Sequence, residues 1–321
     1  MNLKENLSSL KPFLRSIKYN WLNKSTEINY QLAEILNKVE PQKIYPLAYI
    51  VGCGRSGTTI LGNLFSEHPH ITYLFEPYHL WSNIDIQTDV LNLFHLGSSK
   101  LLMDLSDSSH EAKQRFNYFF QTKAQKNTKL IIEKTPLNAL RIGYLETLSP
   151  NAKYIHIIRD GFEVSSSIDK LATNNDYKIA GKPDLNQWWG VNYSKWDILA
   201  NEGKKVGYYS DEIIYLKDNL SKGVYEWLVT LKEMDKWRNI LNNNLLEITY
   251  TQFTNQPENT LKEICTFLEL EYPLSWLNKV VKEVRKSSIK KPKELFLPKK
   301  MCDDFNYYQK KYGFQNIGKY Q

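Results

Sequence analysis

One short segment constrains this chain more than any other. An apolar run at residues 44–51 leads directly into the sequence GCGRSGTT at residues 52–59. Aromatic and β-branched residues before a glycine-rich turn are typical of a buried strand, and residues 58–68 predict a helix that stops before Pro69. A strand, a glycine-rich loop and a helix N-terminus together predict a site where backbone N–H groups bind a phosphate.

The spacing of the loop narrows the type of phosphate site. Gly52 and Gly57 stand as in the phosphate loop of nucleoside triphosphatases, but Thr58 occupies the position of the lysine in that motif. Arg55 supplies a nearby cation instead. A turn with no ligand is the alternative, and an ATP-dependent kinase is a second one. The missing lysine and the lack of an evident aspartate for Mg²⁺ argue against the kinase.

Strands and helices alternate over most of the chain. Strands are expected at residues 44–51, 71–75, 129–133, 153–158 and 245–249, and helices at 58–68, 137–148, 162–171, 224–241 and 258–268. Such alternation is typical of a parallel sheet with helices on both faces. We therefore expect an α/β, P-loop-type three-layer fold with a central parallel sheet flanked by helices.

The domain organisation is expected to be simple. The 321 residues show no internal repeat and no low-complexity linker, so residues 1–321 are predicted to form a single domain. We divide it into a helical N-terminal extension (1–43), a core (45–295) and a C-terminal tail (296–321). Leu14, Ile17 and Trp21 recur at helical spacing in the extension, which predicts that they pack.

A second anion site is indicated by the segment RDGFEVSSS at residues 159–167. It follows a predicted strand, at the edge where open α/β sheets bind ligands. Arg159 can bind a phosphate through two N–H groups, and Ser167 lies about two helical turns further on. Both side chains are therefore expected to face one anion, although a surface arginine beside an ordinary helix start is the simpler alternative.

The overall charge and the cysteines limit partners and location. Lys and Arg number 42 against 35 Asp and Glu, which gives a net charge of +7 and favours anionic partners. The lysines are spread along the chain, so we expect a solvated basic surface and no nucleic-acid partner. Three widely spaced cysteines without a CxxC pair, no signal peptide and no apolar run of membrane-spanning length favour a cytoplasmic protein.

The two motifs together resemble those of sulfotransferases that use 3′-phosphoadenosine 5′-phosphosulfate (PAPS). Four further segments, between residues 61 and 295, agree in order. The segment ending in Glu76-Pro77 is similar to carbohydrate sulfotransferases, and EKTPLN at residues 133–138 is similar to tyrosylprotein and glycan members. LEITYTQF at residues 246–253 and SSIKKPKEL at residues 287–295 resemble the late strand and the C-terminal nucleotide loop. Lys290 and Pro292 depart from that last pattern.

The resemblance implies roles for individual residues. It implies that Glu76 is the general base and that Lys134 neutralises the bridging oxygen of the leaving group, with Arg55 assisting. The residues implied to bind PAPS are Gly54, Arg55, Ser56, Gly57, Thr58, Thr59, Arg159, Ser167, Tyr250, Ser288 and Lys290. His79 is a rival base, and a structural ion pair is the alternative role for Glu76.

The expected reaction is the in-line transfer of a sulfuryl group from PAPS to an acceptor hydroxyl. The acceptor is expected to be a carbohydrate, as a sugar, glycan or glycolipid, with tyrosine or a small alcohol as alternatives. No cluster of acidic, histidine or cysteine residues suggests a metal site. A non-catalytic module that binds nucleotides or polyanions is the alternative from another class. Trp188, Trp189 and Trp196 are expected in the core rather than stacked on an acceptor.

Overall fold

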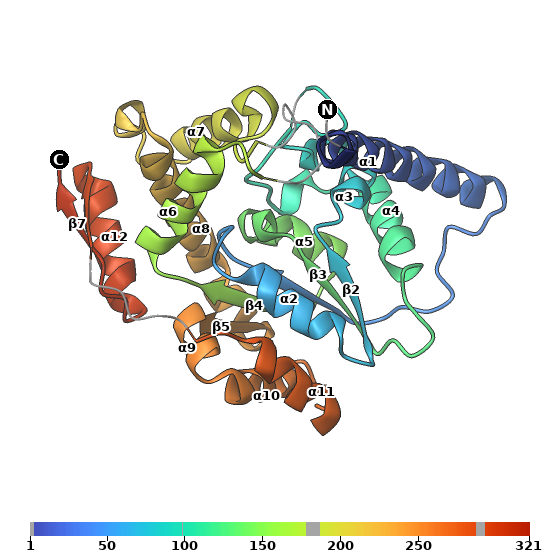
Figure 1. Ribbon diagram of the computed structural model, residues 1–321. Coiled ribbons are helices and arrows are strands. Elements are labelled where there is room, and N and C mark those ends of the chain that lie inside the picture. Colours follow the sequence, from blue (N-terminus) through green and yellow to red (C-terminus); the bar gives the residue numbers. More distant parts are fainter. Residues whose placement is uncertain (1–2, 98, 178–186, 287–292) are drawn as a thin grey trace.

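The computed structural model describes residues 3–97, 99–177, 187–286 and 293–321. Its centre is a sheet of five strands in the order β2-β3-β1-β4-β5, and every pairing is parallel. The strands are β1 (Leu47–Val51), β2 (Ile71–Phe75), β3 (Leu130–Lys134), β4 (Lys153–Ile158) and β5 (Leu245–Thr249). Helices cover both faces of the sheet (Figure 1), so the predicted α/β fold with a central parallel sheet is confirmed.

The helices differ in length and in the layer they occupy. They are α1 (Leu3–Ile35), α2 (Thr58–Ser66), α3 (Tyr78–Ile84), α4 (His110–Gln121), α5 (Ile142–Leu148), α6 (Gly161–Thr173), α7 (Ser194–Lys205), α8 (Asn219–Leu241), α9 (Tyr250–Asn255), α10 (Pro257–Phe267), α11 (Leu274–Val280) and α12 (Lys299–Lys311). One core cluster joins one sheet face to α3, α4 and α5, and another joins the opposite face to α2, α10 and α11.

The sequence of β1 shows why both faces are covered. Successive side chains of a strand point to opposite faces. Tyr49 and Val51 accordingly lie in one core cluster, whereas Ala48 and Ile50 lie in the other. All four are fully buried, so β1 must be central in the sheet. A continuous apolar run is the pattern expected of such a strand.

The carboxyl ends of the five strands meet along one edge, and each carries a residue singled out in the sequence. The glycine-rich loop begins at Gly52, directly after β1, and Glu76 directly follows β2. Lys134 is the last residue of β3, Arg159 follows β4 and Tyr250 follows β5. Because parallel strands end at a common edge, segments far apart in the sequence converge there.

The N-terminal helix packs with the face opposite to the one predicted. Leu14, Ile17 and Trp21 are 60%, 49% and 65% exposed, so the prediction that these side chains pack is wrong. Tyr30 is fully buried instead, and its ring lies 5.4 Å from that of Phe119 of α4. Figure 1 shows α1 lying across α3 and α4.

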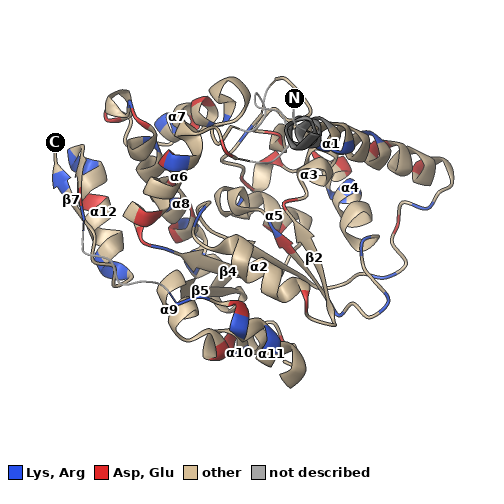
Figure 2. Cartoon of the chain, in the orientation of Figure 1, with Lys and Arg blue, Asp and Glu red and all other residues tan. Residues whose placement is uncertain are grey.

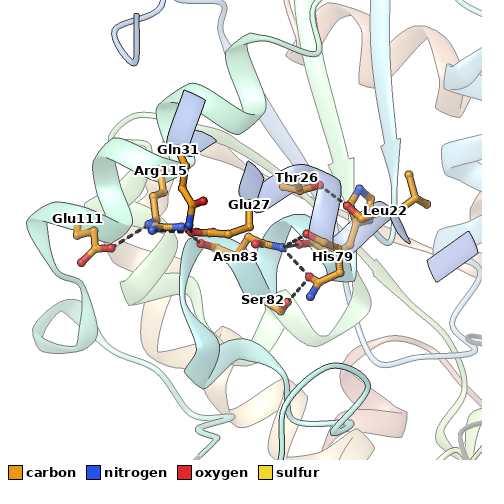
Figure 3. Close-up of polar contacts among 10 residues, drawn as sticks. Leu22, Thr26, Glu27, Gln31, His79, Ser82, Asn83, Glu111 and Arg115 are labelled. Carbon is orange, nitrogen blue, oxygen red and sulfur yellow. Dashed lines mark hydrogen bonds and ion pairs between the residues drawn. The ribbon is translucent and has the colours of Figure 1, made fainter. Parts of the chain in front are cut away.

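Polar contacts explain this orientation of α1 (Figure 3). The side-chain oxygen of Asn23 accepts hydrogen bonds from Ser82 Oγ at 3.0 Å and Asn83 Nδ2 at 2.6 Å. The Arg115 guanidinium donates to Glu27 Oε2 at 2.7 Å. Half-buried polar groups must keep such partners, and this requirement turns the polar face of α1 inward.

The segment expected to be a tail folds against the core. Residues beyond the predicted core form α12 and a two-stranded parallel sheet, β6 (Glu294–Leu297) with β7 (Ile317–Tyr320). Gln309 of α12 accepts a hydrogen bond from Gly161 N at 3.1 Å and donates to Asp160 Oδ2 at 2.9 Å. The C-terminal segment therefore holds the start of α6 directly after Arg159.

The surface charge is distributed over the whole molecule. Figure 2 shows blue basic and red acidic segments interleaved on most helices. The basic residues are thus spread along the described chain, as their positions in the sequence indicate. Within the described ranges, no helix combines the length and apolar character that a membrane-spanning segment requires.

Candidate functional site

The glycine-rich loop has the geometry of an anion cradle. Gly57 caps α2 with a left-handed φ of 104°, and no side chain caps the helix there. The first N–H groups of α2 therefore remain for another acceptor, and the helix dipole favours a negative one. A side chain at Gly57 would meet the ring of Tyr250 at 2.5 Å, and one at Gly54 would meet the ring of Trp188 at 2.4 Å. Both contacts require glycine.

The two sequence motifs meet at Arg55. Its Nε donates a hydrogen bond to Ser167 Oγ at 3.0 Å, and its backbone oxygen accepts one from Arg159 Nη1 at 3.2 Å. The guanidinium of Arg159 lies 4.5 Å from the ring centre of Tyr250 and also binds Glu163 at 2.8 Å. Two guanidinium groups and one hydroxyl thus converge beside the loop.

Lys134 connects the loop to Glu76. Its ammonium group is fully buried and donates to Thr59 Oγ1 at 3.0 Å and to Glu76 Oε1 at 2.5 Å. Burial lowers the pKa of Lys134, and the Glu76 carboxylate acts in the opposite direction. The ammonium also lies 4.1 Å from the ring centre of Phe75. A buried cation is therefore held between an anion cradle and a carboxylate.

Glu76 is held in an uncommon backbone conformation. Its φ is 39°, which a residue with a side chain rarely adopts. Its N–H donates to the Lys134 backbone oxygen at 2.9 Å, and its oxygen accepts from Tyr78 N at 2.7 Å. Burial raises the pKa values of Tyr19, Tyr78 and Tyr177, and the negative charge of Glu76 adds to each shift. Tyrosines from three segments therefore surround this carboxylate.

Two hollows meet at the loop. The first, which we call the outer groove, measures about 410 Å³ and is lined by Arg55, Gly57, Thr58, Thr59, Ile60, Asn63, Leu64, Arg159, Tyr250 and Glu283. The second, the inner cavity, measures about 40 Å³ and is lined by Gly54, Arg55, Thr58, Thr59, Glu76, Tyr78, Leu91, Pro136, Leu137, Tyr177, Trp188, Lys195 and Glu226. Arg55, Thr58 and Thr59 border both, so a group bound by the loop can be reached from either side.

Several residues of the inner cavity were not singled out by the sequence. Lys195 and Glu226 form an ion pair at 2.7 Å, and both side chains are at most 3% exposed. Trp188 donates to Glu226 at 3.0 Å and lies under the Lys195 ammonium, 4.2 Å from the ring centre. Trp188 and Trp189 are buried, as expected, and Trp196 is half-buried, but Trp188 also lines the inner cavity, which the sequence did not predict. No sequence motif could have indicated the ion pair, because Lys195 belongs to α7 and Glu226 to α8.

A second residue that the sequence analysis did not single out is Glu133, which precedes Lys134 in β3. Glu133 is fully buried and accepts hydrogen bonds from Trp81 Nε1 at 3.0 Å, Asn138 Nδ2 at 2.9 Å and the Thr135 hydroxyl. Burial raises its pKa to about 7, although these hydrogen bonds act in the opposite direction. It lines neither hollow, and neither do its partners Trp81, Thr135 and Asn138, so we assign it to the support of Lys134 and not to the reaction.

The remaining predicted residues fall in three places. Ser56 is buried in the loop with Thr58. His79 lies among the residues that join α3 to α1 (Figure 3), lines neither hollow, and burial lowers its pKa to about 4. Ser288 and Lys290 lie outside the described residues. Among those that the structure describes, no group of three or more acidic, histidine or cysteine residues could hold a metal ion.

A larger cavity, about 650 Å³, lies at the other end of the sheet. It is lined by Leu47, Leu130 and Lys153, the first residues of β1, β3 and β4. Ligands of open α/β sheets bind at the carboxyl ends of the strands. We therefore place the candidate site at the outer groove and the inner cavity, despite their smaller volume.

Comparison with known proteins identifies one family. A model described as "Sulfotransferase family" matches residues 46–203, which include the loop, Glu76, Lys134, Arg159 and Ser167. Nodulation protein NoeE of Sinorhizobium fredii is 25% identical over 128 residues, or 38% of this chain. That match covers 30% of the relative's length, so most of it has no counterpart in the alignment.

Solved structures resemble this one in fold. Sulfotransferase STF9 from Mycobacterium avium is 12% identical, with a TM-score of 0.55, and the match covers 94% of this chain and 85% of that one. The sulfotransferase domain of the Synechococcus PCC 7002 olefin synthase is 20% identical, with a TM-score of 0.47, over 86% and 98% of the two chains. At such identities the likeness to STF9 shows a shared fold.

Proposed function

We propose that this chain, whose residues 46–203 match the sulfotransferase family model, transfers a sulfuryl group from PAPS to a hydroxyl of a carbohydrate acceptor. One observation carries the proposal. Lys134 lines neither hollow itself, but it binds Thr59, which borders both the outer groove and the inner cavity, and at the same time Glu76, which lines the inner cavity. A cation for the leaving group and a carboxylate for the incoming hydroxyl are thus adjacent.

The outer groove suits an anionic nucleotide. The uncapped start of α2, Arg55 and Thr58 would hold the 5′-phosphate, and Arg159 with Ser167 would hold the 3′-phosphate. Tyr250 offers a ring face for the base. The shared loop then directs the transferable end of the nucleotide toward the inner cavity. When bound, PAPS supplies the sulfuryl group and a good leaving group.

Besides aligning the donor and the acceptor, the protein must remove a proton from the acceptor and stabilise the leaving group. The Glu76 carboxylate takes the proton of the acceptor hydroxyl as the new bond between oxygen and sulfur forms. The Lys134 ammonium donates to the bridging oxygen as the bond from sulfur to that oxygen breaks and negative charge develops there. The ion pair of Lys134 and Glu76 holds both side chains in place before the acceptor arrives.

The acceptor class rests on the inner cavity. Tyr78, Tyr177 and Trp188 provide aromatic walls, and Lys195 and Glu226 provide buried polar groups. Aromatic faces combined with a few hydrogen-bonding groups suit the edge of a sugar, and a volume of about 40 Å³ encloses the reacting hydroxyl rather than the whole ring. The similarity of the Glu76 segment to carbohydrate sulfotransferases supports the same choice. We also propose a cytoplasmic location, which the three free cysteines support.

Calorimetric titration with 3′-phosphoadenosine 5′-phosphate in EDTA tests the donor directly, because it needs no acceptor. We expect the bisphosphate to bind, and Arg55→Ala to weaken it. ATP with Mg²⁺ is titrated beside it. If only Mg-ATP binds, the kinase alternative replaces the proposal. If neither ligand binds, the site is not a nucleotide site and the polyanion-binding alternative takes its place.

A further inference from the structure

The apolar side of α1 points away from the protein. Six large apolar side chains between residues 14 and 35 are 49% to 75% exposed. We call them the outer stripe: Leu14, Ile17, Trp21, Ile28, Leu32 and Ile35. At about 100° per residue they fall within an arc of roughly 60° on one side of the helix. A surface helix normally turns such an arc toward the core, so the outer stripe requires a partner.

The opposite side of α1 is already occupied. Ser16, Thr26, Tyr30 and Ala33 are buried against the rest of the molecule, and Asn23 and Glu27 bind α3 and α4. Rotating the helix to bury the outer stripe would break these hydrogen bonds and the ion pair with Arg115. The exposure of the outer stripe is therefore fixed by the fold.

The charges beside the outer stripe select the partner. Between Leu14 and Lys24 the sequence carries Arg15, Lys18 and Lys24 and no acidic residue. All three side chains are exposed, and Trp21 lies among them. A helix with basic residues beside an apolar arc that contains tryptophan is typical of segments that lie in the interface of a membrane.

A second copy of the chain fits the outer stripe less well. Apolar residues recur at 14, 21 and 28, but the position between Trp21 and Ile28 that a coiled-coil seam needs is taken by Lys24 and Ser25. Pairing two such helices would bury these polar groups or bring like charges together. The net charge of +7 also opposes self-association and favours an anionic surface.

We propose that α1 is a docking helix that lies on an anionic lipid surface, with the outer stripe in the headgroup region and Arg15, Lys18 and Lys24 against lipid phosphates. This proposal is independent of the reaction. Tyr19 lies on the same helix. Burial raises the pKa of Tyr19, and the nearby Glu76 carboxylate raises it further. At about 100° per residue Tyr19 lies on the side of α1 opposite to the outer stripe, so α1 would stand between the lipid surface and the candidate site.

Flotation of the full chain with vesicles tests the proposal. We expect the chain to bind vesicles made of phosphatidylcholine with about 30% of the anionic lipid phosphatidylglycerol, and to bind vesicles of phosphatidylcholine alone only weakly. High salt should release the bound chain. Trp21→Ser should reduce the partition coefficient at least about tenfold, because it removes a buried aromatic ring from the interface. Ile240→Ser, which changes a side chain of similar exposure (66%) on α8, is the matched control and should have no effect.

A charge reversal separates docking from nonspecific attraction. Lys18→Glu and Lys310→Glu change the net charge equally, and both side chains are exposed. Only the first should weaken binding, by about fivefold or more. Equal effects would overturn a specific docking helix. Absence of vesicle binding would also overturn it, and a dimer in light scattering that Trp21→Ser dissociates would assign the outer stripe to a second copy. Circular dichroism of the same variants shows that they remain folded, whether or not the chain binds a nucleotide.

Discussion

The outer groove and the inner cavity are built in different ways. The groove is formed mainly by one continuous segment, the loop at residues 52–59 and the helix α2 that follows it, to which Arg159 after β4 and Tyr250 after β5 are added. The cavity draws one or two residues from each of several distant segments, such as Leu91, Tyr177, Lys195 and Glu226. A phosphate needs backbone N–H groups and arginines in a fixed local pattern, whereas an acceptor pocket can be assembled from any side chains that the fold brings together.

This difference decides how mutations should act. Changes in the outer groove should alter nucleotide affinity, and changes in the inner cavity should alter acceptor use. Glu76 and Lys134, which are assigned to the reaction itself, should alter turnover with little effect on nucleotide affinity. The predictions below test this division, in order of decreasing effect.

The largest effect is expected for the base. Glu76→Gln keeps the shape of the side chain but removes its capacity to take a proton, so kcat should fall by about 10² to 10⁴-fold. Affinity for the bisphosphate should not change by more than a few-fold. Steady-state kinetics and calorimetry measure the two quantities.

The rival base supplies the control for that experiment. His79→Gln should leave kcat within about threefold, because burial already keeps this side chain neutral and it lines neither hollow. A large loss in His79→Gln together with normal turnover in Glu76→Gln would exchange the two roles.

The buried carboxyl next to Lys134 should affect stability. In the folded chain the pKa of Glu133 is raised to about 7, compared with 4.5 in the unfolded chain. The folded state therefore holds its proton more tightly, and its stability falls as pH rises from 4.5 to 7. The expected contribution is about 3 kcal/mol in total. Urea unfolding across this range measures it.

Two variants isolate that contribution. Glu133→Gln should flatten the pH dependence between 4.5 and 7, whereas Glu40→Gln, which changes an exposed carboxyl on a connecting loop, should leave it unchanged. An identical slope in the Glu133 variant and the native chain would mean that this carboxyl titrates normally.

Nucleotide affinity is expected to depend on the second motif. Arg159→Ala should lower the affinity for the bisphosphate by about tenfold to a hundredfold, because hydrogen bonds to a charged group are lost. The affinity of Arg159→Lys for the bisphosphate should lie between those of the native chain and Arg159→Ala, because lysine keeps the charge but not the paired N–H groups. Lys310→Ala, a change of the same net charge away from the groove, should have no effect. Acceptor KM should stay constant, and a change there would break the division between the two hollows.

The smallest effect is expected in the inner cavity. The hydroxyl groups of Tyr78 and Tyr177 form a hydrogen bond of 3.3 Å. Tyr177→Phe should raise the acceptor KM by only a few-fold and leave nucleotide affinity unchanged. Tyr215→Phe, which alters an exposed tyrosine, serves as its control. Weaker nucleotide binding in the Tyr177 variant would show that the hollows act as one.

Much of the fold was predictable because the decisive patterns are local. Strands β2, β4 and β5 occupy the predicted residues, since each is a short run of mostly apolar or β-branched residues that ends at a turn or a helix start. That the segments of Arg55 and Ser167 lie close together could also be predicted, because both motifs follow parallel strands.

The rest depends on tertiary contacts. The apolar spacing in residues 14–21 predicted packing, but partners for Asn23 and Glu27 on α3 and α4 decided which face turns inward. Likewise, Lys195 and Glu226 are ordinary charged residues in the sequence, and only the crossing of α7 and α8 makes them a buried pair. A single sequence contains no local pattern for such pairings.

The contact between Trp188 and Gly54 has a thermodynamic consequence. The ring that walls the inner cavity rests on the loop that borders the outer groove, so a ligand that shifts the loop also changes the free energy of a ligand beside the ring. Such linkage is reciprocal. The factor by which nucleotide alters acceptor affinity must equal the factor by which acceptor alters nucleotide affinity, whichever of the two binds first.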